Sequence, residues 1–176
     1  MAKARFTFAV FLASLPMLAA GFRASAVKVD ITPQSPQWLM GYQARQSTGV
    51  HDKIYHRVVA MDSGDTQFYL ISSDLCLFSP VVYEEVAEDL RKELSIQPKQ
   101  FWWSVTHTHA APEVGPPSIY KALLGRSDHE WDREYTTLVK SSLIEAVKKA
   151  HATLEPACYP AQRRCRRRQC RLKKRR

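Results

Sequence analysis

FYLISSDLCLFSPVVYEEVAEDLRKEL (residues 68–94), followed by FWWSVT at 101–106, decides the fold. The apolar run that begins this stretch, at 66–77, predicts a central strand covered on both faces. Ser79 and Pro80 then predict a helix start, and apolar residues recur at helical spacing up to Ser95, with acids on the opposite side. The β-rich run at 101–106 predicts the next strand. The order strand, helix, strand indicates an α/β fold.

Outward from this stretch, the same reasoning predicts two further strands, a loop and a second helix. These elements are expected at 27–31 (strand), at 55–61 (strand, joined to the 66–77 strand by a hairpin turn at 62–65), at 110–127 (loop with one helical turn around 118–124), and from Asp128 or Asp132 to near Leu154 (helix). The predicted fold class is α/β, with a mixed β-sheet flanked by helices.

The charge of the chain lies at its two ends. The net charge is +9, but ten of the 26 Lys and Arg residues lie between Arg163 and Arg176, and three precede residue 27. The remaining thirteen share the 27–156 stretch with all 17 acids, which gives that stretch a net charge of −4. The basic excess therefore does not describe the globular part, and we expect no specific nucleic-acid partner.

The first 26 residues have the pattern of a secretory signal peptide. Lys3 and Arg5 precede an apolar run over 6–22, and Ala24 and Ala26 provide small residues for a peptidase. An uncleaved anchor helix is disfavoured, because the run is shorter than the roughly 20 residues that span a bilayer and Pro16 interrupts it. We expect cleavage near Ala26 and export to the periplasm or the medium.

The last twenty residues, 157–176, combine ten basic residues with three cysteines and no acid. Such a segment cannot bury a face, so we expect it to be disordered. It is either an arm that binds polyanions or the product of out-of-frame reading, which we favour because it follows a well-patterned helix abruptly. Its cysteines, Cys158, Cys165 and Cys170, match no zinc-motif spacing, and Cys76 among apolar neighbours is expected to be a buried thiol.

His107 and His109 follow directly on the strand predicted at 101–106. Side chains alternate along an extended backbone, so both rings would point to one side, with Cα atoms about 6–7 Å apart. Two neutral imidazoles at a strand end can present nitrogens to Zn²⁺. Structural histidines would give the same pattern, so the spacing leaves both roles open.

Several short motifs in order extend this observation: VDITP (29–33), MGY (40–42), GVHD (49–52), SSDLC (72–76) and THTH (106–109) with Pro112. On these motifs, residues 27–156 resemble the N-terminal part of the neutral/alkaline non-lysosomal ceramidase family, and the AAPEVG at 110–115 is closer to its uncharacterised bacterial relatives. The resemblance implies hydrolysis of the N-acyl amide of ceramide-like lipids to sphingosine and a fatty acid, with one zinc ion. A membrane surface would then be met only through the substrate.

The resemblance also implies roles for individual residues. It makes His107 the metal ligand and His109 the catalytic histidine that faces the substrate amide. The family's other zinc ligands come from regions beyond residue 156, so we expect residues 27–156 to be the incomplete N-terminal part of a larger catalytic domain, inactive as this fragment. The main rival is an exported, non-enzymatic ligand-binding module on the same fold, and polyanion binding through the tail is the other.

Other residues carry two interpretations each. Asp74 either orients His107 or His109 as a hydrogen-bond acceptor or caps the following helix. The His51–Asp52 pair lies in a loop that can reach the site. The four histidines outside the motif are expected to be solvated or structural: His51, His56, His129 and His151. Of the tryptophans at 102 and 103, we expect one in the core and one at the surface.

Overall fold

The computed structural model describes residues 21–116, 121, 125 and 129–157. In chain order the elements are β1 (Arg23–Asp30), β2 (Tyr55–Asp62), β3 (Gln67–Ser73), α1 (Pro80–Leu94), a 3₁₀ turn η1 (Pro98–Gln100), β4 (Phe101–Val105), α3 (Arg133–Ala152) and β5 (Glu155–Pro156). Residues 1–20 of the expected signal peptide, most of the helical turn expected around 118–124, and residues 158–176 of the expected tail lie outside the described residues. None of the helices described is long and apolar enough to cross a membrane.

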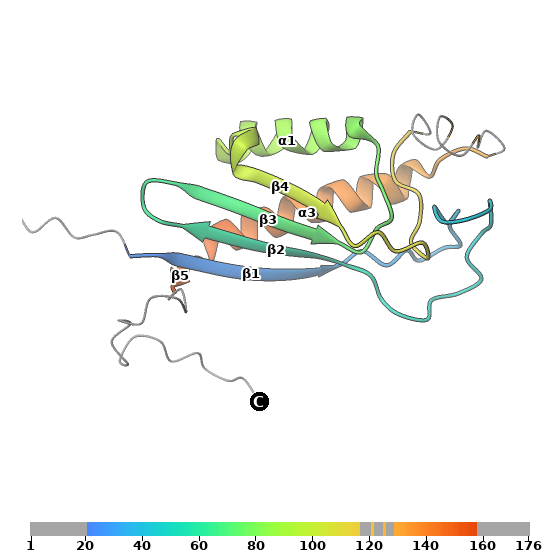
Figure 1. Cartoon of the computed structure of the whole chain (residues 1–176), viewed down its shortest axis with the longest axis horizontal. Helices are drawn as coiled ribbons and strands as arrows, with labels where there is room; N and C mark the ends of the chain where they lie inside the picture. The colour runs from blue at the N-terminus through green and yellow to red at the C-terminus, as the bar shows by residue number, and fades with distance from the viewer. Residues whose placement is uncertain (1–20, 117–120, 122–124, 126–128, 158–176) are drawn as a thin grey trace, which may run out of the picture.

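The five strands form one mixed sheet in the order β4-β3-β2-β1-β5 (Figure 1). β1 pairs antiparallel with β2 and with β5, and β2 pairs antiparallel with β3. β4 lies parallel to β3. The predicted α/β fold with a mixed sheet is therefore confirmed.

The parallel pair is made by the β3–α1–β4 crossover that the deciding stretch predicts. Pro80 occupies the first turn of α1, and Ser79 is the N-cap residue with an extended backbone. Val82, Val86 and Leu90 are buried, as their helical spacing indicates. The helix ends where Ser95 takes a left-handed conformation (φ 57°). This crossover brings the carboxyl ends of β3 and β4 to the same edge of the sheet.

The core lies on one face of the sheet, where α1 and α3 pack together. Figure 1 shows α3 running behind the sheet. Trp103 is buried in this core and Trp102 is 63% exposed, which confirms the expected division of the pair. On the opposite face, Val59, Leu70 and Trp102 are direct neighbours across β2, β3 and β4 and are all exposed. The prediction that both faces of β3 are covered is therefore wrong within the described residues, because alternate side chains of β3 face away from the helices.

β1 begins four residues before its predicted start at Val27. Arg23 and Ala24 pair with Asp62 and Met61 of β2 and with the two residues of β5. The Arg23 guanidinium forms an ion pair with the buried Asp62 carboxylate. The Ser25 hydroxyl donates to the Ala150 carbonyl of α3 at 2.5 Å. These partners, rather than local strand propensity, extend the strand.

The second helix starts at the later of the two expected positions. Asp132 is the N-cap, and its side chain accepts a hydrogen bond from the Tyr135 N–H at 2.7 Å. The same carboxylate accepts from the Gln37 side chain at 2.8 Å. Asp132 therefore fixes both the start of α3 and the loop that follows β1.

Candidate functional site

The candidate site lies where β3 and β4 end. Two loops leave this edge, 74–79 after β3 and 106–115 after β4, and they run side by side. The Thr106 N–H donates to the Ser73 carbonyl at 2.9 Å, and the Thr108 N–H donates to the Leu75 carbonyl at 3.3 Å. In α/β sheets, ligands bind beyond the carboxyl ends of parallel strands, so this edge is the expected place for a site.

His107 departs from the extended conformation that its position after a strand predicts. β4 ends at Val105, and His107 has a left-handed backbone with φ 60°. Such a conformation is unfavourable for a residue with a side chain and is concentrated at functional sites. The rings of His107 and His109 nevertheless meet, with centroids 5.1 Å apart and planes at 68°. Strand alternation is thus wrong as the reason for their proximity, because the turn at His107 creates it.

Cys76 joins the two histidines. Its sulfur lies 4.0 Å from Nδ1 of His107, and that nitrogen lies 3.0 Å from the Cys76 carbonyl oxygen. Cys76 is buried, which confirms the burial expected for this thiol. One donor atom from each of Cys76, His107 and His109 lies within 4.8 Å of the others. Sequence reasoning missed this cluster, although Cys76 and His107 both follow the ends of strands predicted to be neighbours.

The donor set of this cluster fits a zinc ion. Thiolate sulfur and imidazole nitrogen are ligands that zinc prefers, and catalytic zinc sites commonly use about three protein donors with one open position. Nδ1 of His109 is buried and has no hydrogen-bond partner among the described residues. A buried polar atom without a partner costs free energy, so a metal ion or a polar group of a bound molecule next to Nδ1 of His109 would remove this cost.

A segment from the first loop holds His109 in place. Gly41 passes so close that a Cβ at this position would lie 2.1 Å from the His109 Cβ. The Arg45 guanidinium donates to the Gly41 carbonyl at 2.7 Å and to the His109 carbonyl at 3.5 Å. The Tyr42 ring meets the His109 ring edge-on at 4.7 Å. The MGY motif at 40–42 therefore acts on the histidine through close backbone packing.

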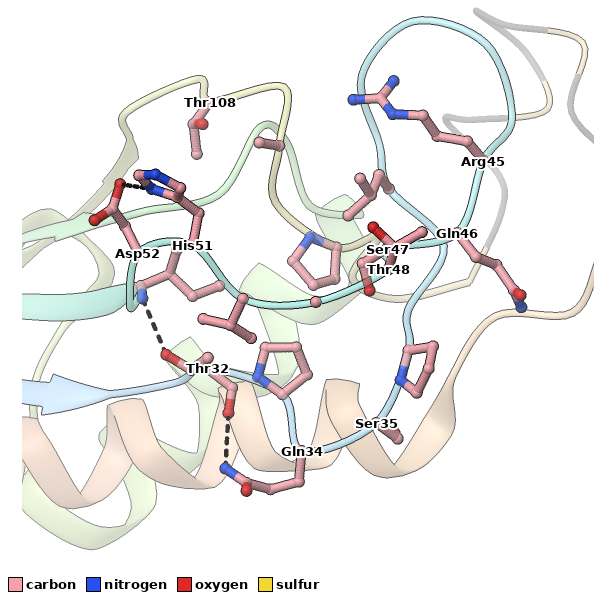
Figure 2. Close-up of a pocket in the computed structure, with 18 residues that line it drawn as sticks. Thr32, Gln34, Ser35, Arg45, Gln46, Ser47, Thr48, His51, Asp52 and Thr108 are labelled. Atoms are coloured by element: carbon pink, nitrogen blue, oxygen red, sulfur yellow. Dashed lines mark hydrogen bonds and ion pairs between the residues drawn. The ribbon is translucent and has the colours of Figure 1, made fainter.

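A cleft of about 820 Å³ borders the histidine segment. Figure 2 shows Thr108 on one side, with Thr32, Gln34 and Ser35 across from it. His51 and Asp52 also line the cleft, and both are highly exposed. Their 2.9 Å contact raises the pKa of His51, since the charged imidazolium is the better donor to the carboxylate. His107 and His109 are outside the cleft lining, so Thr108 is the link between the cleft and the cluster.

Two solved structures share this arrangement of elements. A neutral ceramidase from Pseudomonas aeruginosa superposes with a TM-score of 0.64 and 20% sequence identity over 78% of this chain. A structure described as a ceramidase complexed with C2 superposes with a TM-score of 0.62 and 19% identity over 78% of this chain. The fold is ceramidase-like.

The chain spans 22% of the length of each ceramidase, so it corresponds to a part of a larger ceramidase domain. No protein-family model and no curated protein sequence matches the chain. The likeness at this identity concerns the fold, and the activity named for those two proteins is considered for this chain below.

Asp74 has neither of its two expected roles: its side chain bonds to neither histidine, and Ser79 is the N-cap residue of α1. One carboxylate oxygen accepts from the Tyr55 N–H at 3.0 Å, and the other lies 2.7 Å from the Arg57 guanidinium. Asp74 therefore ties the end of β3 to the start of β2. Its partners lie on β2 because the antiparallel register places Tyr55 and Arg57 beside the end of β3.

The histidines outside the motif are solvated or structural, as expected. His56 is buried and bonded to the Ser73 hydroxyl at 2.5 Å and to the Val139 carbonyl at 2.9 Å, and burial lowers its pKa to about 4. His129 pairs with the buried Glu113 carboxylate at 2.8 Å, and His151 lies 2.6 Å from the Tyr69 hydroxyl. These contacts join α3, or the segment before it, to the sheet and the loop after β4.

Proposed function

We propose that this chain carries the histidine-bearing part of a zinc-dependent hydrolase that cleaves the N-acyl amide of ceramide-like lipids. The observation that carries the proposal is the Cys76–His107–His109 donor cluster at the carboxyl edge of a ceramidase-like fold. An adjacent cleft of about 820 Å³ is within the usual size of small-molecule sites, roughly 300–1,000 Å³. Two solved structures with a similar fold are both described as ceramidases.

In this proposal His107 holds the metal. Its Nδ1 must donate to the Cys76 carbonyl, since a carbonyl oxygen only accepts. The electron pair of Nε2 is then available to bind a metal. A bound zinc ion supplies an activated water and polarises a carbonyl group. The hydrogen bond from Nδ1 fixes the ring orientation and the tautomer that a metal requires.

His109 is the residue proposed to act on the substrate amide. An imidazole beside the reacting carbonyl can donate a hydrogen bond to the developing oxyanion or pass a proton to the leaving nitrogen. Gly41 and Arg45 fix the backbone of His109 and therefore position this ring. Thr108, between the two histidines, faces the cleft that would take the lipid amide.

The test supplies the part of the catalytic domain that this chain does not span. The chain is fused to the remaining region of the Pseudomonas aeruginosa neutral ceramidase, and sphingosine release from a short-chain ceramide is measured with zinc present. We expect turnover that is lost in both His107→Ala and His109→Ala, and retained in His151→Ala, whose ring contacts Tyr69 and lies outside the cleft lining. A folded, zinc-loaded fusion without turnover would favour the non-enzymatic ligand-binding module instead.

A further inference from the structure

We infer that Cys76 binds the metal as a thiolate beside His107. This inference rests on the proposed metal at His107 and adds a ligand that the motif itself does not contain. Cys76 comes from the loop after β3, whereas His107 comes from the loop after β4. The parallel pairing of these strands brings the two residues together from positions 31 apart in sequence.

The contacts between the two residues favour joint binding. The Cys76 sulfur lies 4.0 Å from Nδ1 of His107, and the Cys76 carbonyl fixes that ring by accepting from Nδ1, so the metal would bind at Nε2 of the same ring. Zinc–sulfur bonds of about 2.3 Å and zinc–nitrogen bonds of about 2.0 Å place neighbouring ligand atoms roughly 3.5 Å apart in a tetrahedral site. One donor atom from each of Cys76, His107 and His109 lies within 4.8 Å of the others, so the side chains must move closer together on binding to reach this spacing.

One of the two proposed ligands is buried and the other is exposed, which suits a metal site that is protected but can be reached from solvent. Cys76 is 3% exposed, which shields a sulfur ligand from oxidants and competing solvent. His107 is exposed at the surface, which leaves an entry path for the ion and an open position for water. On binding, the thiol releases its proton to solvent and the sulfur donates an electron pair to the metal. No change of oxidation state occurs.

The experiment uses Co²⁺ as a spectroscopic substitute for zinc, on the full chain. Cys158, Cys165 and Cys170 are first changed to serine, so that Cys76 is the remaining thiol. Titration with Co²⁺ is expected to give a near-ultraviolet sulfur-to-cobalt charge-transfer band. Cys76→Ser should abolish the band and lower the Co²⁺ affinity by at least about tenfold. His109→Ala is the matched control, because it changes the same cluster but should keep the band.

Several results would overturn the inference. They are Co²⁺ binding without the band, unchanged affinity in Cys76→Ser, or no Co²⁺ binding at all. Circular dichroism and the thermal midpoint establish that each variant is folded, and Cys76→Ala provides a second substitution if the serine is poorly tolerated. The result is independent of turnover: a sulfur band with no ceramide hydrolysis in the fusion would contradict the proposed function and retain the ligand. Hydrolysis without the sulfur band would support the proposed function and contradict Cys76 as a ligand.

Discussion

At the scale of single residues, His109 is held in place by contacts that Gly41 and Arg45 make with its backbone and Cβ. Gly41 lies so close to His109 that a Cβ on Gly41 would overlap the His109 Cβ. The Arg45 side chain donates to the backbone carbonyls of both Gly41 and His109. The ring nitrogen Nδ1 is left without a partner among the described residues. The position of this histidine therefore depends on the absence of a single methyl group.

Gly41→Ala is expected to push His109 out of place. The added Cβ would lie 2.1 Å from the His109 Cβ and 2.5 Å from its carbonyl oxygen, so the backbone must shift. Overpacking of this kind costs about 1–3 kcal/mol, and the free energy of unfolding in urea should fall by that amount. Gly49→Ala is the control, because no atom lies within 4 Å of its added Cβ. Equal losses in the two variants would show that the contact is unimportant.

His56 makes the stability of the fold sensitive to acid. Burial lowers its pKa from 6.5 to about 4, so the unfolded chain binds a proton more readily than the folded chain. The stability that neutral His56 contributes is complete above pH 6.5 and is lost as the pH falls toward 4, by about 3 kcal/mol in total. Urea unfolding across this range should show the loss in the natural chain and a shallower one in His56→Gln. Identical pH slopes would contradict the assignment.

At the scale of elements, the β3–α1–β4 crossover could be predicted almost completely from sequence. Its strands are continuous apolar runs, and Ser79, Pro80 and the spacing of Val82, Val86 and Leu90 specify the helix locally. β5 could not be predicted, because a two-residue strand exists only through its pairing with β1. The contact between Cys76 and His107 could not be predicted either, because it depends on the long-range pairing of β3 with β4. From its apolar neighbours alone, Cys76 was expected to be only a buried thiol.

The amino-terminal half of β1 shows how tertiary partners decide an element. Residues 23–26 (RASA) lack an apolar alternation and follow an apolar run, so the sequence assigns them to a leader. In the fold they pair with β2 and β5, and Arg23 neutralises the buried Asp62. We therefore propose that, where the expected leader is removed, cleavage falls before Phe22 and not near Ala26. N-terminal sequencing of exported protein checks this expectation.

Removal of these residues should destabilise the sheet. A chain that begins at Val27 loses the Ser25 bond to α3 and leaves the Asp62 carboxylate buried without its cation. We expect its free energy of unfolding to be lower by about 3 kcal/mol than that of a chain that begins at Phe22. Thermal and urea unfolding of the two chains provide the measurement. Coincident midpoints would mean that residues 23–26 contribute nothing to the fold.

At the scale of the whole molecule, the sheet has one face covered by helices and one face exposed, as far as the described residues show. The stripe formed by Val59, Leu70 and Trp102 is exposed on the open face. The chain also spans 22% of the two ceramidases whose fold it shares. The sequence motifs and the similarity of the folds both point to ceramidases. This chain's own structure places the His107–His109 pair just after β4, at the edge where β3 and β4 end.

The central claim is that His107 holds a metal at this edge, and zinc content tests it most directly. The full chain, with Cys158, Cys165 and Cys170 changed to serine, is loaded with zinc, desalted and measured by elemental analysis. We predict stoichiometric zinc in this chain and in His51→Ala, and loss of zinc in a folded His107→Ala variant. Equal zinc in all three proteins, or none in the folded parent, would contradict the account.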